Sequence, residues 1–276
     1  MAPWIAVGVL LLALTALVGV FLGPAAWRRL RQARWRQQPF PTTWRRILRR
    51  RWPLYARLPP NLQARLRRQM LVLLAETPFV GCNGLAVTTE MRVLVAAQAA
   101  LLRLRDDAGS FPNLREVLLY PAAFVVDRTV PDGAGLWRSE RRVQSGESWQ
   151  RGQVILSWPD VLAGAADPAD GENVVIHEFA HQLDQQRGAA TGAPFLGHRD
   201  RYPGWAAAFG TAFAETRQRE AAGQRTLIGA YGASAPAEFF AVASERFFEC
   251  PAALAQAHPA LYHVLSVYYG VDPLAW

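Results

Sequence analysis

The stretch from Val174 to Asp184 constrains the fold of this chain more than any other. It contains the pattern H-E-x-x-H, in which His177 and His181 are four residues apart. Residues four apart lie one turn above each other on an α-helix, so both imidazoles project from one face. Apolar residues precede His177 and follow it, which suits burial. The stretch therefore predicts a buried helix that presents two histidines side by side.

Two imidazoles in this arrangement suit a metal ion. Zn²⁺ binds neutral imidazole nitrogen at about 2.0–2.1 Å. Glu178, next to the first histidine, is placed to act as general base on a zinc-activated water. The alternative is a structural helix whose histidines are satisfied by hydrogen bonds, because so short a pattern also occurs by chance. Only five histidines occur in the chain, and two of them stand in this motif.

A catalytic zinc site needs three protein ligands and one position open to water. Metzincins supply the third ligand from the extended pattern H-E-x-x-H-x-x-G-x-x-H. In this chain Asp184 replaces the glycine and Arg187 replaces the last histidine, so that class is excluded.

Gluzincins take their third ligand, a glutamate, from a later helix. The candidates are Glu238 and Glu245, which are seven residues apart on a helix predicted over 237–248, with His198 as an outlying alternative. Glu238 stands among apolar residues, where burial of a carboxylate is costly unless it is paired or bound to metal.

The positive charge of the chain is confined to one segment. All 30 basic residues are arginines, and 14 of them lie between Arg28 and Arg68, where there is no acidic residue. The other 16 arginines against all 22 acidic residues leave the rest of the chain with a formal charge of −6. This distribution argues against direct nucleic-acid binding by the catalytic domain.

The arginine-rich segment itself has aromatic residues between its arginines, a mixture that would also fit a nucleic-acid patch. Beside a membrane anchor, we favour attraction of this segment to anionic lipid headgroups.

The N-terminal region predicts a membrane anchor. Residues 4–23 carry no charge, and twenty helical residues span about 30 Å, the thickness of a bilayer core. Arginines follow this stretch directly, which predicts that the C-terminal side faces the cytoplasm. A cleaved signal peptide is the alternative, but signal peptides carry their positive charges before the apolar run. We expect a single-pass protein of a bacterial-type inner membrane, with its catalytic domain in the cytoplasm.

The predicted domains follow from these features. They are a short tail over residues 1–3, the transmembrane anchor over 4–23, an arginine-rich juxtamembrane linker over 24–43 and a zinc peptidase domain over 44–276. Periodicity and turn residues predict the elements of the last domain. The helices are expected over 62–75, 90–105, 205–219, 237–248 and 260–269, and the strands over 116–120, 124–126 and 153–158. The fold class predicted is α+β.

The two cysteines, Cys82 and Cys250, are far apart in the sequence and form no C-x-x-C pair. A single disulfide between them is the alternative, but we expect buried thiols, because a free cysteine packs as a small hydrophobic residue.

Several separate blocks of the chain resemble the Mlc titration factor A family of zinc peptidases. The blocks are Y-P-A-x-F-V-V-D over 120–127, Q-S-G-x-S-W-Q over 144–150, H-E-x-x-H-x-x-D over 177–184, the stretch from Tyr231 to Glu238, and F-x-A-V-x-S-E-x-F-F over 239–248. The resemblance extends over roughly residues 44–276. More distantly, the tyrosine and glutamate seven apart resemble the catalytic domain of anthrax lethal factor.

The resemblance implies a zincin-like (gluzincin) metallopeptidase domain. It implies Glu238 as the third zinc ligand and Tyr231 as the residue that stabilises the transition state. Members of the family act as aminopeptidases on small substrates, and at least one binds a transcriptional repressor of sugar uptake and removes it from DNA. This chain differs by its N-terminal apolar stretch and arginine-rich linker.

Two further acidic residues are expected near the zinc. Asp184, three residues past His181 on the same helix face, is predicted to hydrogen-bond a liganding imidazole, with a structural carboxylate at the helix end as the alternative. Glu245 is predicted to support the site from outside the ligand set or to be structural. The strand over 153–158 is expected to offer an edge on which an extended peptide could lie.

The sequence therefore predicts a zinc-dependent, aminopeptidase-like metallopeptidase that binds one catalytic Zn²⁺ and hydrolyses peptides. Its partners would be a peptide substrate, the membrane and a regulatory protein. The alternative is a regulatory module that sequesters a transcriptional regulator and uses zinc only structurally. A structural site would be closed by four protein ligands, and the sequence offers three convincing ones, which favours catalysis.

Overall fold

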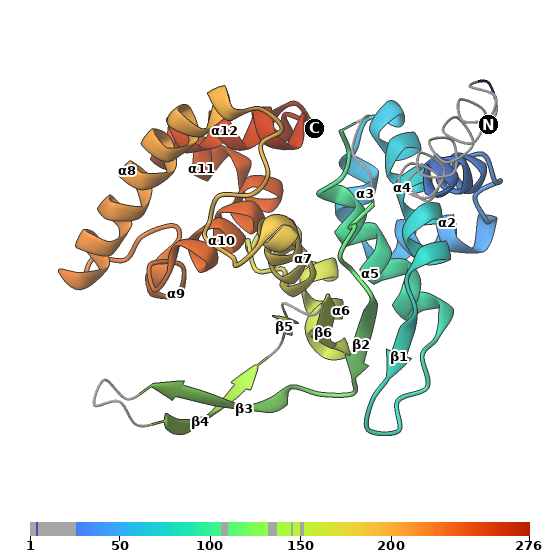
Figure 1. The fold of residues 1–276 in the computed structure, drawn as a ribbon, viewed down its shortest axis with the longest axis horizontal. Coiled ribbons are helices and arrows are strands. Elements are labelled where there is room, and N and C mark those ends of the chain that lie inside the picture. The colour runs from blue at the N-terminus through green and yellow to red at the C-terminus, as the bar shows by residue number, and fades with distance from the viewer. Residues whose placement is uncertain (1–3, 5–25, 106–109, 132–136, 145, 150–151) are drawn as a thin grey trace. The chain divides into compact units, whose positions relative to one another are not determined.

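The computed structural model of this chain describes residue 4 and residues 26–105, 110–131, 137–144, 146–149 and 152–276 (Figure 1). These residues belong to two compact units, Met1–Pro39 and Phe40–Trp276. In the first unit, residues 26–36 are helical. The predicted anchor over 4–23 lies outside the described residues, apart from Trp4. Within the described residues, no helix has the length and apolar character needed to cross a membrane.

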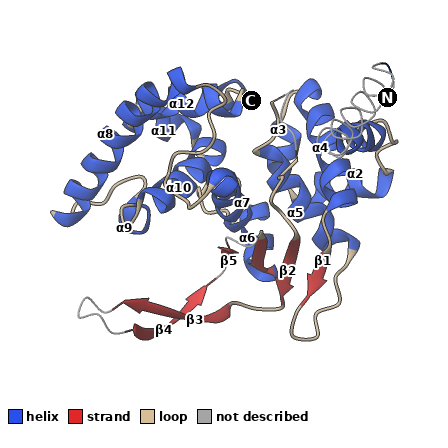
Figure 2. Cartoon of the chain, viewed as in Figure 1, coloured by secondary structure: helices blue, strands red, loops and turns tan. Residues whose placement is uncertain are grey.

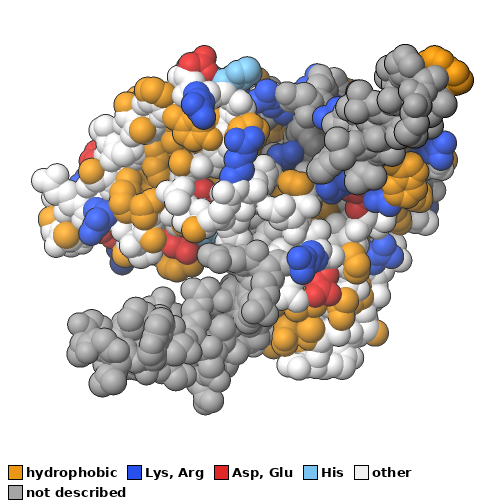
Figure 3. Space-filling view, in the orientation of Figure 1, with side chains coloured by type: hydrophobic (Ala, Val, Ile, Leu, Met, Phe, Trp, Pro, Cys, Tyr) orange, Lys and Arg blue, Asp and Glu red, His pale blue; other side chains and the backbone are white. Residues whose placement is uncertain are grey.

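The second unit begins with helices formed by the arginine-rich segment. These are α2 (Thr42–Arg51), α3 (Pro53–Arg57) and α4 (Pro60–Glu76), which are followed by α5 (Thr89–Leu101). The prediction of a helix over 62–75 is confirmed by α4, whereas α2 and α3 were not predicted. Trp52 and Tyr55 are buried in the core, so these aromatic side chains pack inside the domain rather than between arginines at its surface. Arginine side chains lie at several separate places on the face shown in Figure 3.

A four-stranded sheet follows, in the order β1-β2-β6-β5. The strands β1 (Phe79–Gly81), β2 (Glu116–Tyr120) and β6 (Gln153–Ser157) are parallel, and β5 (Gly146–Trp149) is antiparallel to β6. Parallel strands are usually covered on both faces, which suits the apolar runs Val117–Leu119 and Val154–Leu156.

The strand β3 (Phe124–Pro131) continues well beyond the predicted residues 124–126 and pairs with β4 (Trp137–Gln144) in a separate antiparallel hairpin. The prediction that strand 153–158 offers an edge is wrong. β6 pairs on both sides, with β2 and with β5, so its backbone groups are already used. Trp158 begins the helix α6 (Trp158–Ala166) instead of ending the strand. Pro159 lies in the first turn of α6, where a missing N–H does no harm.

The rest of the chain is helical, as Figure 2 shows. It comprises α7 (Val174–Asp184), α8 (Tyr202–Ala221), α9 (Gly229–Gly232), α10 (Pro236–Glu249), α11 (Pro251–Ala257) and α12 (Pro259–Tyr269). Helices predicted over 205–219, 237–248 and 260–269 are confirmed by α8, α10 and α12. The fold is therefore a helix-rich α+β fold, as predicted.

Glycine is required at the start of β6. Gly152 has a φ of +80°, and a Cβ there would lie 2.0 Å from the backbone oxygen of Asn113. Gly223 has a similar φ of +74° but open space around it.

We expect Gly223→Ala to lower the free energy of unfolding by about 1 kcal/mol, the cost of a left-handed alanine. Gly152→Ala should lower it by about 3 kcal/mol or more, because the backbone of residue 113 must also move. Urea unfolding of both variants measures the difference, and equal losses would contradict the steric argument.

Candidate metal centre

Two helices hold the site. α7 begins at the N-cap Asn173, whose Oδ1 accepts the backbone N–H of Ile176 at 3.0 Å. Ten consecutive residues of α7, Val175 to Asp184, are buried. α10 begins after Ala235 with a proline in its first turn and packs along α7. Because both helices are held in the core, the side chains between them have little freedom.

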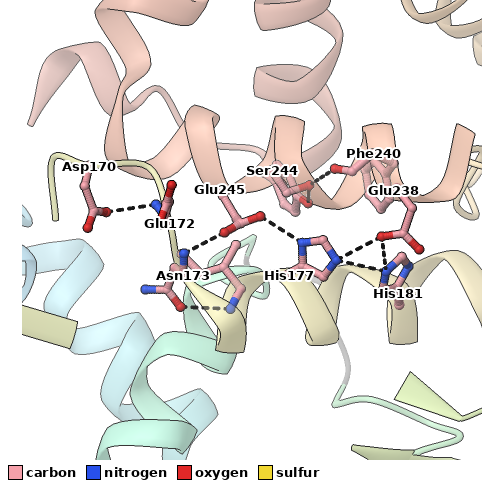
Figure 4. Close-up of polar contacts among 11 residues, drawn as sticks. Asp170, Glu172, Asn173, His177, His181, Glu238, Phe240, Ser244 and Glu245 are labelled. Carbon is pink, nitrogen blue, oxygen red and sulfur yellow. Dashed lines mark hydrogen bonds and ion pairs between the residues drawn. The ribbon is translucent and has the colours of Figure 1, made fainter. Parts of the chain in front are cut away.

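Three predicted ligands converge between α7 and α10 (Figure 4). The Oε2 atom of Glu238 lies 3.1 Å from Nε2 of His177 and 3.4 Å from Nε2 of His181. The two Nε2 atoms are 3.2 Å apart. In the described part of the chain, these three residues are the group of His, Cys, Asp and Glu side chains whose ligand atoms could hold one metal ion. His198 is exposed and does not belong to this group.

The spacing of these atoms fits a tetrahedral ion. Two ligands at about 2.0–2.1 Å from a tetrahedral centre are separated from each other by about 3.3–3.4 Å. The three observed separations, 3.1, 3.2 and 3.4 Å, lie close to that value. Two imidazole nitrogens and one carboxylate oxygen are also the donor set of a catalytic zinc site such as His₂Glu. The residues therefore fit Zn²⁺ in both geometry and chemistry.

Charge and hydrogen bonding reinforce the convergence. Burial alone would raise the pKa of Glu238, but hydrogen bonds from His177 and His181 and their charge hold that pKa well below its usual value. Burial would lower the pKa of His177, whereas its contacts with Glu238 and Glu245 raise that pKa well above the usual value. An anionic carboxylate therefore faces two imidazoles in a buried place.

Glu245 holds the far side of the first histidine. Its Oε1 atom lies 2.8 Å from Nδ1 of His177, while its Oε2 atom accepts the backbone N–H of Asn173 at 2.5 Å. A carboxylate on Nδ1 orients the ring and directs Nε2 toward the other two groups. Glu245 therefore contacts an imidazole rather than the metal position, in line with one of its two predicted roles.

A cavity of about 750 Å³ adjoins these residues. It is bordered by α6, α7, α9, α10 and the loop before α7, and His177 and Glu178 lie in its wall. Its charged lining consists of five acidic residues and one arginine: Asp160, Asp170, Glu172, Glu178, Glu245 and Arg246. The potential in the cavity is therefore negative, which favours a positively charged group.

Tyr231 lies on α9 at the mouth of this cavity and is 56% exposed. Its ring centroid is 5.7 Å from that of His177. Partial desolvation of the hydroxyl and its interaction with the Glu238 carboxylate raise the pKa of Tyr231 above the usual value. The hydroxyl therefore keeps its proton and can donate a hydrogen bond near the three converging groups.

Asp184 has a different partner from the predicted imidazole. Its Oδ2 atom accepts the backbone N–H of Gly192 at 2.7 Å. Burial raises the pKa of Asp184, although hydrogen bonds from the backbone of residues 191–193 and the charge of His181 oppose the rise. The chain turns back after α7, so the loop over 191–193 lies against the Asp184 carboxylate. Asp184 therefore holds this loop at the end of the helix.

The two cysteines are free, as predicted, but only partly buried. Cys250 ends α10, where its thiol donates to the carbonyl oxygen of Ala169.

Three polar residues beside the site were not predicted: Gln98, Asn173 and Glu249. Each is buried, and the amide of Asn173 contacts both of the others. Asn173 had a signal in the sequence, since an asparagine before an apolar run is a typical N-cap. Gln98 and Glu249 lie in the buried parts of α5 and α10, and no sequence signal pointed to either.

The sequence comparisons agree with this geometry. The family described as glucose-regulated metallo-peptidase M90 matches residues 25–270. The chain belongs to this metallopeptidase family.

Similar curated proteins come from several bacteria. The uncharacterized protein slr2042 of Synechocystis is 38% identical over 266 residues, covering 95% of this chain and 96% of its own. Mlc titration factor A of Klebsiella pneumoniae is 36% identical, covering 80% of this chain and 84% of its own. Mlc titration factor A of Serratia proteamaculans is 37% identical, covering 81% and 85%. The predicted resemblance to the Mlc titration factor A family is confirmed.

Glu249 should make the stability of the protein depend on pH. Burial, followed by the charge of Glu245, raises the pKa of Glu249 from 4.5 to about 8, although a hydrogen bond from Asn173 opposes the rise. Between these two pH values the unfolded chain loses the proton that the folded protein retains, so the free energy of unfolding falls as pH rises. We expect a loss on the order of a few kcal/mol from pH 4.5 to pH 8.

Glu249→Gln should reduce this pH dependence, because its amide does not titrate. Urea unfolding at several pH values measures the slope for both proteins. An equally steep slope in the variant would show that Glu249 is not its source.

Proposed function

We propose that this chain is a zinc-dependent metallopeptidase with aminopeptidase-like activity. One observation carries the proposal, the convergence of His177, His181 and Glu238 at separations that suit a tetrahedral ion. These residues would hold Zn²⁺, and Zn²⁺ there would act as a Lewis acid toward water and the substrate carbonyl. The arrangement of the predicted ligands on H-E-x-x-H and a later glutamate is that of a gluzincin.

The protein's own residues supply the remaining steps. Glu178, in the cavity wall beside His177, accepts a proton from the attacking water and passes it to the leaving amine. Tyr231 donates a hydrogen bond to the oxyanion that develops on the substrate carbonyl. Glu245 keeps the ring of His177 in place through Nδ1.

The charge of the cavity supports the choice of an aminopeptidase. A free peptide N-terminus is an ammonium group, and the five acidic side chains in the cavity wall favour it over a neutral acyl group. An extended substrate could pair with β5, one of the two outer strands of the described four-stranded sheet, which packs against α7.

The first experiment separates metal binding from catalysis. We expect Glu178→Gln to retain the fold and one zinc per chain but to lose peptidase activity, because it removes the base and no ligand. His177→Ala, His181→Ala and Glu238→Ala should lose zinc. Metal analysis and hydrolysis of aminoacyl nitroanilides measure both properties. Full zinc in Glu238→Ala together with depletion in Glu245→Ala would overturn the third ligand.

Blocking the substrate tests the aminopeptidase proposal. The N-acetylated form of the same aminoacyl nitroanilide should not be cleaved, and internally quenched peptides with blocked termini should be poor substrates. Cleavage of blocked peptides at equal rates would identify an endopeptidase instead.

The role of Tyr231 is tested by deleting only its hydroxyl. We expect Tyr231→Phe to lower kcat about 10²–10³-fold, with zinc content and KM little changed, because the hydrogen bond is formed mainly in the transition state. Steady-state kinetics and metal analysis measure the effect. A kcat within about threefold of the wild-type value, far less than one lost oxyanion donor costs, would remove Tyr231 from the mechanism.

A second function, binding of a regulatory protein, is favoured by the name of the relatives, Mlc titration factor A. This function would need a protein surface rather than the general base. Glu178→Gln should therefore still bind such a partner in a pull-down assay if the chain has this role.

We infer that residues 4–23 anchor the protein in the inner membrane and that the peptidase domain faces the cytoplasm. The uncharged run followed by arginines supports this, and the family match begins after the run, at residue 25. The full chain should remain in the membrane fraction after carbonate extraction, whereas a version beginning at Trp44 should be soluble. N-terminal sequencing that finds a mature protein starting near Trp27 would indicate a cleaved signal peptide.

A further inference from the structure

Asn173 joins four helices beside the candidate metal centre. Only 1% of its surface is exposed. Its backbone N–H donates to Glu245 of α10, and its Oδ1 caps α7. Its Nδ2 faces three acceptors: Gln98 Oε1 of α5 at 2.8 Å, Glu249 Oε1 of α10 at 2.8 Å and the carbonyl oxygen of Gly164 of α6 at 3.1 Å. Its carbonyl oxygen accepts the backbone N–H of His177 at 2.9 Å. Every polar atom of Asn173 is therefore held by a hydrogen bond.

The contact with Glu245 replaces a local helix cap. In a capping box, the side chain of the third helical residue accepts the backbone N–H of the N-cap. In α7 that position is Ile176, which cannot accept a hydrogen bond. Glu245 reaches across from α10 and takes this role with one oxygen, while its other oxygen accepts from His177 Nδ1 (Figure 4).

The helix start and the first predicted ligand are thus held by the same carboxylate. A change in the position of the Asn173 N–H would allow Glu245 to rotate, and the ring of His177 would lose its orienting partner.

The neighbouring helix is shaped to keep Asn173 in place. A Cβ on Gly164 would lie 3.1 Å from Cα of Asn173 and 3.2 Å from its Cγ. Glycine therefore lets α6 approach closely enough for its carbonyl oxygen to accept from Nδ2. The three atoms around Nδ2 accept hydrogen bonds in the structure, so a donor suits this position.

We propose that Asn173 is a positioning residue of the metal centre, which sets the orientation of His177 through Glu245 without touching the metal. The metal-binding part of this inference rests on the proposed function, whereas the hydrogen bond between Glu245 and His177 does not.

Asn173→Ser and Asn173→Asp test this role. Both retain the backbone N–H and a side-chain oxygen that can cap α7, but both lose Nδ2, and aspartate places an anion against three acceptors. We expect zinc affinity, measured by competition with a chromophoric chelator, to fall about 10–100-fold, the usual cost of losing a group that orients a ligand. The loss should be larger for Asn173→Asp.

Thr88→Ala is the matched control. Thr88 is the N-cap of α5, where its hydroxyl accepts the N–H of Met91, and it has no contact with Glu245 in the described structure. This variant should lose thermal stability but retain zinc affinity. Thermal unfolding of the metal-free proteins shows which variants remain folded.

A second measurement needs no metal. In the metal-free wild type and Thr88→Ala, NMR should detect a His177 Nδ1–H proton that exchanges slowly with water because Glu245 accepts it. In Asn173→Ser this signal should be lost. A retained signal with zinc affinity within about threefold of the wild-type value would overturn the proposal, as would the absence of the signal in the wild type. A wild type that shows the signal but binds no zinc would overturn the proposed function and leave the positioning role standing.

Discussion

The packing of α7 against α10 is the constraint on which the site depends. It brings His177 and His181 of α7 against Glu238 and Glu245 of α10. The two glutamates are seven residues apart, which is about 10.5 Å along the helix. Glu238 contacts Nε2 of His177 and Glu245 contacts Nδ1, so one imidazole is held from both of its nitrogens. Glu245 is buried and Glu238 is half-buried, so both carboxylates would be costly without partners, and each finds one on α7. The polar contacts therefore fix the register of the two helices, and the surrounding apolar side chains supply the burial.

The rest of the domain keeps that pair of helices in place. The strands β5 and β6 and the helices α5 and α6 contact α7, while the aromatic side chains of α10 pack against α12. Phe247 and Phe248 each contact Tyr269, and Ser244 hydrogen-bonds its hydroxyl at 2.7 Å. At the end of α7, Asp184 accepts a hydrogen bond from the loop that follows the helix. At the start of α7, Asn173 caps the helix. Both ends of α7 are thus held by buried polar contacts, which suits a candidate site that requires a defined ligand geometry.

The sequence predicted what local patterns encode. Helical spacing predicted the paired histidines, and an acidic residue in an apolar setting pointed to Glu238. The elements α4, β2, α8, α10 and α12 follow from periodicity, and each was predicted within a few residues of its bounds. The errors have physical causes. The strand predicted over 153–158 ends one residue early because Trp158 begins α6, whose first turn accommodates Pro159. α2 was missed because its five arginines outnumber the apolar residues that face the core, and α3 was missed because it is only five residues long.

Contacts between distant segments could not be predicted. The sequence placed Asp184 on the same face as His181 but contained no sign that the 191–193 loop would return to it. Nor did it show that β5 would occupy the free side of β6, since pairing depends on which strands meet after folding. The same limit applies to Gln98 and Glu249, whose roles depend entirely on where Asn173 lies.

The surroundings of the three converging residues bear on whether a metal there would be catalytic or structural. A structural zinc site is closed by four protein ligands and shielded from solvent. Here the described residues supply three, and two residues of the H-E-x-x-H motif, His177 and Glu178, face a cavity of about 750 Å³. Glu245, the other carboxylate in contact with His177, is committed to Nδ1 of that ring and to a backbone N–H, so it is not available as a fourth ligand. A metal held by three protein ligands beside this cavity would leave a position for water, as the proposed hydrolysis requires, whereas a purely structural ion would need no such cavity.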